Sequence, residues 1–279
     1  MPARVSFFKS GRFVTLVWAL AVAFAWEAVA FVIADVLRDR MAGSKLPYLH
    51  DVIATIIGNA GLLSSAILTT LSRAVLGFAA GAAVGFALAV FMSLFRPIER
   101  IAYPYLLLSQ MIPILGLAPV VISIVHKVRI GSVTIQASDI TRVVIAAYIT
   151  FFPVATNTLS GLKAVDRDKR NLMFSYAATT PTRYVKLMIP FSVPFLFSGL
   201  KIAAPLAVTA SILVDSLGAA GGIGYNLTYS LYTGAYPIFW ASVLCSAAMG
   251  ILGYYSMVLL EAACMPWKAV SAANGRNVK

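Results

Sequence analysis

The sequence predicts an all-α protein that crosses a membrane with about six helices. Of its 279 residues, 60% are hydrophobic and only 11% are charged, which is too apolar for a soluble globule with a wetted surface. Apolar runs of the roughly 20 residues that a spanning helix needs recur along the whole chain. The expected spans are 13–34, 74–95, 101–125, 143–162, 191–217 and 239–264.

The distribution of charge predicts the orientation of these spans. The net charge is +12, and placing the N-terminus in the cytoplasm leaves 14 Lys and Arg residues inside and 6 outside, with Arg73 and Lys201 near the membrane boundaries. Because cytoplasmic loops carry the excess of Lys and Arg, both termini are expected inside, as tails 1–12 and 268–279 around a transmembrane domain at 13–267. The first span is too long for a signal peptide, so we expect an uncleaved anchor. The basic residues sit at span ends, which favours membrane lipid over nucleic acid as their partner.

The second and third spans carry contrasting small-residue patterns. Gly77, Gly81 and Gly85 recur every four residues, and such a face lets helices approach closely. We favour a packing face inside one bundle over a seam between two copies of the chain.

The third span contains "QMIPILGLAPVV", with Pro113, Gly116 and Pro119 within seven residues. Such residues leave backbone groups without hydrogen bonds inside the helix. At membrane depth these groups are tolerated only where they contact other parts of the protein or line a water-filled path. Gln110 and Pro113 are therefore candidates for the lining of a path, although a kink without that meaning remains an alternative. The connection that follows, "HKVRIGSVTIQASDITR", favours a short hairpin.

Three acids fall inside or beside the spans, namely Glu27, Asp215 and Glu261. Charge inside a membrane is costly and by default marks function or a buried partner. Asp215 precedes a turn with four glycines at the outer end of the fifth span, and two interpretations stay open: a carboxylate that is wetted and caps a helix, or an element of a gate. The turn contributes Gly218, Gly221, Gly222 and Gly224.

Residue patterns for catalysis, metal binding or nucleotide binding do not occur. His50 and His126 lack Cys, His or carboxylate neighbours at metal-ligand spacing, and Cys245 and Cys264 are too few for a disulfide framework. A glycine-rich phosphate loop ending in Lys and Ser or Thr is also missing from the sequence. We therefore expect no catalytic residue, metal or cofactor on this chain.

A polar stretch separates the fourth and fifth spans, at about 163–189. Asp166 is a suitable N-cap for one short helix, and Thr180 followed by Pro181 is a start signal for another. The first helix carries an apolar stripe outside the bilayer, which favours a soluble partner over a merely solvated loop. The stripe consists of Leu172, Met173, Tyr176 and Ala177.

From about Leu46 to Trp267 the chain resembles the permease subunits of type I ABC importers, in the branch of nitrate, sulfonate and taurine carriers. The resemblance is carried by "LSRAVLGFAAGAAVGFALAV", "QMIPILGLAPVVISI", "FFPVATNTLSGLKAVD", "MIPFSVPFLFSGLKIA", "DSLGAAGGIGYNL" and "MPW". It implies a six-span subunit of the bacterial inner membrane that pairs with a second copy or a homologous permease. It also implies two cytoplasmic ATP-binding subunits, which hold ATP and Mg, and a periplasmic or extracellular solute-binding protein.

In that family the loop before the Pro190 position carries a Glu-Ala-Ala motif, with Gly six residues after the Glu. It forms a coupling helix that enters a groove on the ATPase. Counting back from Pro190 places the family glycine at Ala177 and the glutamate at Asn171. The resemblance thus implies that the residues in contact with the ATPase are Asn171, Leu172, Met173, Tyr176, Ala177 and Ala178.

The sequence departs from the family pattern in that loop, and it has Asp215 where the family usually has Glu. Two other classes of protein therefore stay open. One is a secondary transporter or channel, although ion-coupled carriers usually show inverted repeats and several midplane charges that we do not find here. The other is a non-conducting partner subunit, which the departures in the coupling loop suggest.

Overall fold

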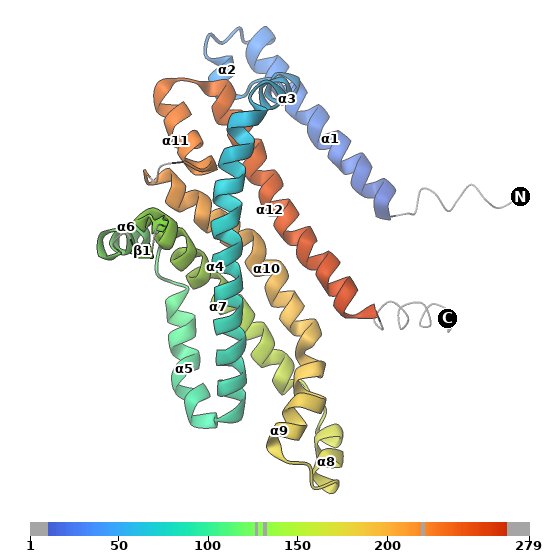
Figure 1. The fold of residues 1–279 in the computed structure, drawn as a ribbon. Coiled ribbons are helices and arrows are strands. Elements are labelled where there is room, and N and C mark those ends of the chain that lie inside the picture. Colours follow the sequence, from blue (N-terminus) through green and yellow to red (C-terminus); the bar gives the residue numbers. More distant parts are fainter. Residues whose placement is uncertain (1–10, 126–127, 131–132, 219–220, 267–279) are drawn as a thin grey trace, which may run out of the picture. The chain divides into compact units, whose positions relative to one another are not determined.

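The computed structural model describes residues 11–125, 128–130, 133–218 and 221–266, and this part is almost entirely helical (Figure 1). The expected tail at 268–279 and most of the tail at 1–12 lie outside the described residues, as does His126. The α-helices are α1 (Gly11–Phe31), α2 (Ala42–Lys45), α3 (Leu49–Gly58), α4 (Ala60–Leu94), α5 (Arg96–Ser109), α6 (Ile114–Ile124), α7 (Ala137–Lys163), α8 (Arg167–Ser175), α9 (Thr180–Arg183), α10 (Ile189–Ser216), α11 (Ile223–Thr233) and α12 (Tyr236–Cys264). Two π-helical segments, η1 (Val32–Val36) and η2 (Tyr184–Met188), continue α1 and precede α10.

Within the described part of the chain, five helices are long and apolar enough to cross a membrane. A sixth span is formed if α5 and α6, which are bent by 99° at a short break, count as one. The all-α polytopic fold predicted from the sequence is confirmed. The five continuous spans are Phe13–Val36, Ala60–Leu94, Ala137–Lys163, Thr180–Ser216 and Tyr236–Cys264.

The predicted start of the second span, at residue 74, is wrong by 14 residues, because α4 begins at Ala60. The polar residues of this extra stretch are compatible with a helix since their hydroxyls bond to the helix's own carbonyls. Thr69 donates to the carbonyl oxygen of Ser65 at 2.9 Å, and Ser72 to that of Thr69 at 3.0 Å. Such bonds satisfy a hydroxyl without another partner.

The described residues form two compact units. One holds the described residues of Met1–Ser64 together with Asn226–Leu244, and the other those of Ser65–Tyr225 together with Cys245–Lys279. The second unit contains the candidate sites considered below, and its core lies where α4 and α10 pack against α7.

The glycines of α4 are the reason that this helix lies so close to α7. A Cβ added at Gly81 would stand 2.4 Å from the carbonyl oxygen of Ala147, and one at Gly85 would stand 2.5 Å from that of Phe151. Gly77 is in the same position against Ala146. The predicted packing face inside one bundle is therefore confirmed.

In the first unit, two tryptophans, one on α1 and one on α12, bond to the chain between α1 and α3. Trp26 and Trp240 meet edge to face, with ring centroids 5.5 Å apart. Their indole N–H groups donate to the carbonyl oxygens of Pro47 and Ser44 at 2.9 and 3.2 Å. Glu27, one of the three acids in the spans, accepts a hydrogen bond of 3.1 Å from the backbone N–H of His50 in the first turn of α3.

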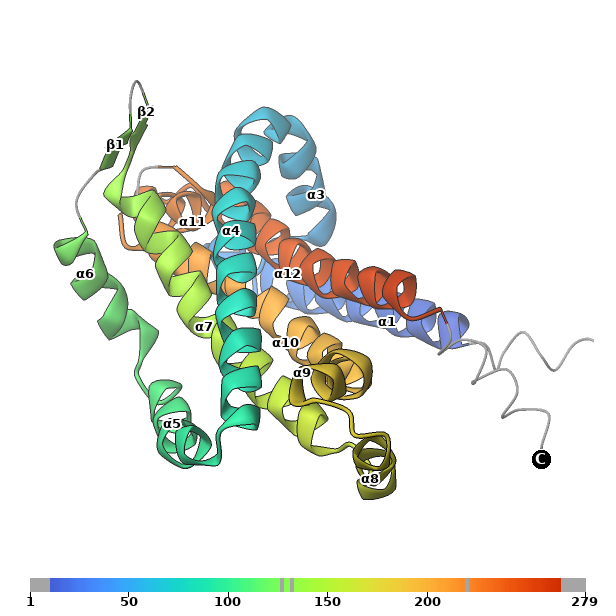
Figure 2. The same cartoon turned by 60° about the horizontal axis from the view of Figure 1, so that its bottom comes forward.

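The predicted hairpin is present as β1 (Val128–Ile130) and β2 (Val133–Ile135), an antiparallel pair in which Arg129 lies opposite Thr134. Figure 2 shows it at one end of α7, with α8 and α9 near the other. The two connections flanking α7 are thus separated by the length of a spanning helix.

Candidate functional site

The segment 163–189 folds as two short helices joined at a bend. As predicted, Asp166 caps α8, and its carboxylate accepts a hydrogen bond of 3.0 Å from the backbone N–H of Asp168. The predicted cap of the second helix is wrong by one residue, because Thr179 precedes α9 in an extended conformation. The hydroxyl oxygens of Thr179 and Thr182 lie 2.9 Å apart, which stabilises this earlier start.

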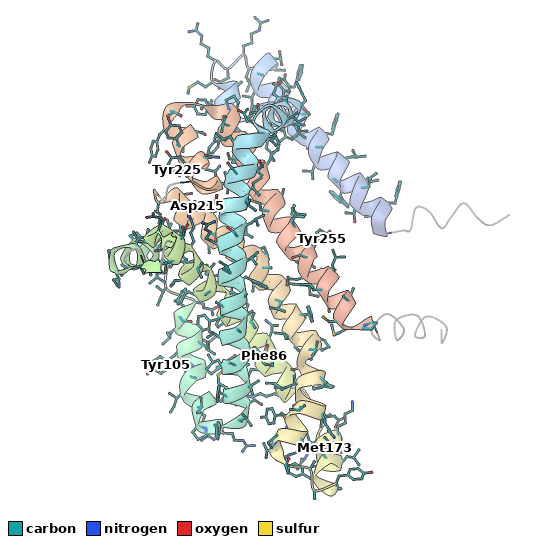
Figure 3. The ribbon with its side chains drawn as sticks, viewed as in Figure 1. Phe86, Tyr105, Met173, Asp215, Tyr225 and Tyr255 are labelled. Carbon is teal, nitrogen blue, oxygen red and sulfur yellow. The ribbon has the colours of Figure 1, made fainter. Side chains whose placement is uncertain are left out.

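Side chains of α8 form an exposed apolar surface. Leu172 is 57% exposed, Phe174 58% and Tyr176 77%. Met173, which is labelled in Figure 3, is half-buried. Phe174 was missed in the sequence because the predicted stripe followed strict helical spacing. Its ring lies 4.1 Å from the guanidinium carbon of Arg183, a cation–π contact that joins α9 to α8.

The two helices are separated at Ala177, which adopts a left-handed backbone conformation with φ of 48°. The N–H of Ala177 donates to the carbonyl of Phe174 at 2.9 Å, and that of Ala178 to Met173 at 3.0 Å. These two bonds are the Schellman motif, whose left-handed position favours glycine because glycine has no Cβ. The helix α8 therefore ends at Ser175, although residues 167–178 contain no Gly or Pro that would mark an end in the sequence.

At the opposite end of α10, a buried carboxylate connects three helices (Figure 3). Asp215 accepts one hydrogen bond from Arg142 Nε of α7 and a second, of 2.6 Å, from the hydroxyl of Thr70 on α4. The Arg142 side chain is 1% exposed and that of Asp215 is 0% exposed. Asp215 is therefore not the wetted helix cap that the sequence left open.

Further polar groups extend this contact. Arg142 Nη1 donates to Asp139 at 2.6 Å, and Arg73 Nε donates to the same carboxylate oxygen at 3.1 Å. We call these four side chains, Arg73, Asp139, Arg142 and Asp215, the charge network. The sequence had placed Arg142 in a connection, but α7 begins at Ala137 and buries it.

The glycine turn after α10 closes over the same carboxylate. Arg142 Nη2 donates to the carbonyl of Gly221 at 2.8 Å. Gly218 and Gly222 have φ of 96° and 99°, a region that L side chains rarely adopt. A Cβ at Gly222 would stand 2.3 Å from Asp215 Oδ2, and one at Gly224 only 2.0 Å from a backbone carbonyl of α10. The turn can approach α10 this closely only because these positions carry no side chain.

The broken span forms a third candidate site, because a cavity of about 300 Å³ lies at the break. Gln110 follows the end of α5 and lines the cavity, and Pro113 is the N-cap of α6. The other walls come from α7 and α10. Gly116 and Pro119 do not belong to the break as predicted, since both lie inside α6.

The last acid in the spans, Glu261, also has a cationic partner. Lys201 Nζ of α10 lies 2.6 Å from Glu261 Oε2 of α12. Both side chains are mostly buried. The sequence offered Lys201 as a charge near the membrane boundary but gave no sign of its partner, which lies 60 residues further along the chain.

Residues 77–264 match the family model described as the binding-protein-dependent transport system inner membrane component. The chain belongs to this family of permeases. The match covers the three candidate sites apart from Arg73 and Thr70.

Several relatives carry transport names and align over most of this permease. The formylaminopyrimidine transport permease protein ThiX of Halalkalibacterium halodurans is 30% identical over 237 residues, which are 83% of this chain and 90% of the relative. The riboflavin transport system permease protein RibX of Chloroflexus aurantiacus is 26% identical, over 76% of this chain and 75% of its own. The putative aliphatic sulfonates transport permease protein SsuC of Bacillus subtilis is 22% identical, over 82% and 88%.

The fold itself is similar to that of a solved ABC transporter. A chain from the crystal structure of an amino acid ABC transporter with histidines superposes with a TM-score of 0.57 at 19% identity, over 75% of this chain and 96% of that one. The type I permease resemblance seen in the sequence is confirmed. The permease is thus a multi-pass inner membrane component of an ABC transporter, a system that includes ATPase and binding-protein partners.

Proposed function

We propose that this permease pairs with a second copy or a homologous permease and moves a small solute inward when two cytoplasmic ATP-binding subunits close on its 163–189 segment. A periplasmic or extracellular binding protein delivers the solute. ATP and Mg bind to the ATPase subunits and not to this chain. The observation that carries the proposal is the exposed apolar surface of α8.

The chemistry of α8 suits a soluble partner. Leu172, Phe174 and Tyr176 are each more than half exposed, although all three lie outside the long apolar helices. Burying a large apolar side chain contributes about 1.5–3 kcal/mol to binding, so three such side chains are enough to hold α8 in a groove of the ATPase. Asn171 and Ala178 flank this surface and complete the proposed contact.

The charge network supports a gate at the other end of the helices. Asp215 joins α4, α7 and α10 through Thr70 and Arg142, and the glycine turn covers the joint. Opening a path between these helices would require the buried ion pair to separate or move. We propose that the network holds the outer gate shut, with Gly218, Gly222 and Gly224 shaping the turn that moves with it.

The same proposal assigns the orientation. The 163–189 segment is rich in Lys and Arg, and the positive-inside bias puts it in the cytoplasm. Both termini then lie inside, around a transmembrane permease domain at 13–267 in the cytoplasmic membrane of a bacterium. Gln110 and Pro113, at the break of the third span, are proposed to border the path.

The experiment is copurification of the permease with its ATPase and binding protein, followed by ATP-driven uptake at matched membrane expression. Leu172→Asp should lose the ATPase, because the groove would bury an unpaired charge. Thr182→Ser, a small change on α9 that keeps the hydroxyl next to Thr179, is the control and should keep both ATPase and uptake. If Leu172→Asp retains the ATPase as well as the control does, α8 is not the coupling helix.

A further inference from the structure

The cavity at the break between α5 and α6 has walls without charge. Every residue that lines it is uncharged at neutral pH, and most are aliphatic or aromatic. We propose that this cavity recognises the transported solute and that the part it holds is an uncharged planar ring. The inference rests on the proposed function and adds the chemical class of the cargo to it.

The charge argument excludes an ionic cargo from this pocket. An ion placed against apolar walls at membrane depth needs a partner of opposite sign, because isolated charges are costly there. The nearest cation along the chain is Lys201, next to the lining residue Ile202, but its Nζ lies 2.6 Å from Glu261. Arg142 is committed to Asp215 and Asp139. No described residue therefore offers the cavity a counter-ion.

Two aromatic rings give the cavity its shape preference. Tyr148 and Phe152 lie one turn apart on α7 and both line the cavity, so they present neighbouring ring surfaces from one wall. Aromatic side chains favour stacked or edge contacts with other rings. A volume of about 300 Å³ is at the lower end for small-molecule sites, which suits a solute of one or two rings.

One polar group is available to orient such a ring. The side chain of Gln110 is exposed and hydrogen-bonds to no other described residue. Its amide offers both a donor and an acceptor, the pair that ring nitrogens and amino groups require. The Tyr148 hydroxyl, in contrast, already donates to the carbonyl of Ser109, which fixes its ring against the break. Gln110 is thus the specificity-determining residue of the proposal.

The test measures protection of a cysteine in the cavity wall. Ile202→Cys is built in a chain with Cys245→Ala and Cys264→Ser, copurified with the ATPases in nanodiscs and treated with a membrane-permeant maleimide. The probes are formylaminopyrimidine, an uncharged ring compound, and ethanesulfonate, a charged one. The ring compound at about ten times its dissociation constant should slow alkylation roughly tenfold, and the sulfonate should not. Leu206→Cys, also in the lining, replaces Ile202→Cys if that variant does not assemble.

Two matched controls complete the test. Val120→Cys lies exposed on α6 outside the cavity and should show no protection by either probe. Gln110→Leu should lower the affinity for the ring compound about tenfold, the effect of one lost hydrogen bond, so that the same concentration slows alkylation only about twofold. The same change at exposed Gln136 should leave the protection unaltered.

Equal protection by the sulfonate, or no effect of Gln110→Leu, would overturn the inference. Unchanged alkylation with both probes would also overturn it. Loss of the ATPases from the wild-type complex would count against the proposed function alone, because alkylation of Ile202→Cys can also be measured on the permease in nanodiscs without them.

Discussion

Arg142 Nε lies 2.5 Å from Asp215 Oδ1 and joins α7 to α10 across 73 residues of sequence. A buried ion pair is stable only when its remaining donors and acceptors are also satisfied. Here Thr70 donates to the second carboxylate oxygen, and the other guanidinium nitrogens reach Asp139 and Gly221. The pair is therefore part of a closed set of contacts, in which a change at one member affects the others.

Asp215→Asn should alter gating while the complex still assembles. The amide keeps the size of the side chain but leaves Arg142 without the charge that balances it. Removing one partner of a buried pair costs up to about 3–5 kcal/mol, so the closed gate should loosen. We expect raised ATP hydrolysis in proteoliposomes without binding protein, together with changed uptake. Unchanged hydrolysis and uptake would leave Asp215 without a role in the gate.

A double replacement distinguishes a role of the ion pair in gating from a role in stability alone. Arg142→Met with Asp215→Leu removes both charges, and such apolar replacements are often neutral or stabilising by about 1–4 kcal/mol. Asp139 keeps its contact with Arg73 at 3.1 Å. We expect thermal stability near that of the wild type but poorly regulated ATP hydrolysis. If regulation is also normal, the pair only holds the helices together.

Gly222→Ala and Gly218→Ala form a matched pair. Both glycines have φ near 100°, so alanine should cost each about 1–3 kcal/mol in backbone strain. Only at Gly222 would the new Cβ also collide with Asp215, because Gly218 has open space within 4 Å. Gly222→Ala should therefore melt at a lower temperature than Gly218→Ala and show the basal hydrolysis of Asp215→Asn. Identical melting and hydrolysis in the two variants would contradict the close approach of the turn.

Ala177→Gly should stabilise the 163–189 segment. Glycine relieves the left-handed strain at this position, which costs other residues roughly 1–2 kcal/mol. Ala177→Trp should weaken binding of the ATPase, because overpacking its groove with the larger side chain costs about 1–3 kcal/mol or more. Ala178→Gly is the control, because Ala178 does not have a positive φ and gains nothing. The measurement is ATPase retention during washing at rising temperature; equal retention in Ala177→Gly and Ala178→Gly would refute the strain argument.

Cysteine labelling from the outside of intact cells tests the orientation. Tyr232→Cys should react with an impermeant maleimide, because the interval 216–237 contains no Lys or Arg and is expected outside. Arg167→Cys should react only after the membrane is permeabilised. Both positions are exposed, so a reversed pattern would reverse the topology.

The sequence could predict features that depend on neighbouring residues. Apolar length identified the spans, and the carboxylate of Asp166 needs only the N–H of Asp168, two residues away, to cap α8. The burial of Arg142 had no such local sign, since a charged residue at a span end looks the same whether water or a distant acid is its partner. Ala177 was hidden for another reason: alanine favours helix, and only the surrounding hydrogen bonds impose the left-handed turn.

The broken span contains one proline whose role the sequence could predict and one whose role it could not. Pro113 marks the break because its fixed φ suits the start of α6. Pro119 lies within the same helix, and prolines inside spanning helices are tolerated when neighbouring groups satisfy the freed carbonyl. The sequence pattern alone does not distinguish the two prolines, because the difference lies in their surroundings.

The charge network has an electrical consequence. It contains two cations and two anions, Arg73 and Arg142 with Asp139 and Asp215, so its members carry no net charge when they move together. Moving one elementary charge across a membrane potential involves about 2.3 kcal/mol per 100 mV, but a balanced set feels almost none of this field. A gate in which these four residues move as one unit opens with the same ease in energised and de-energised cells, and ATP-driven uptake should then keep its rate when a voltage is imposed.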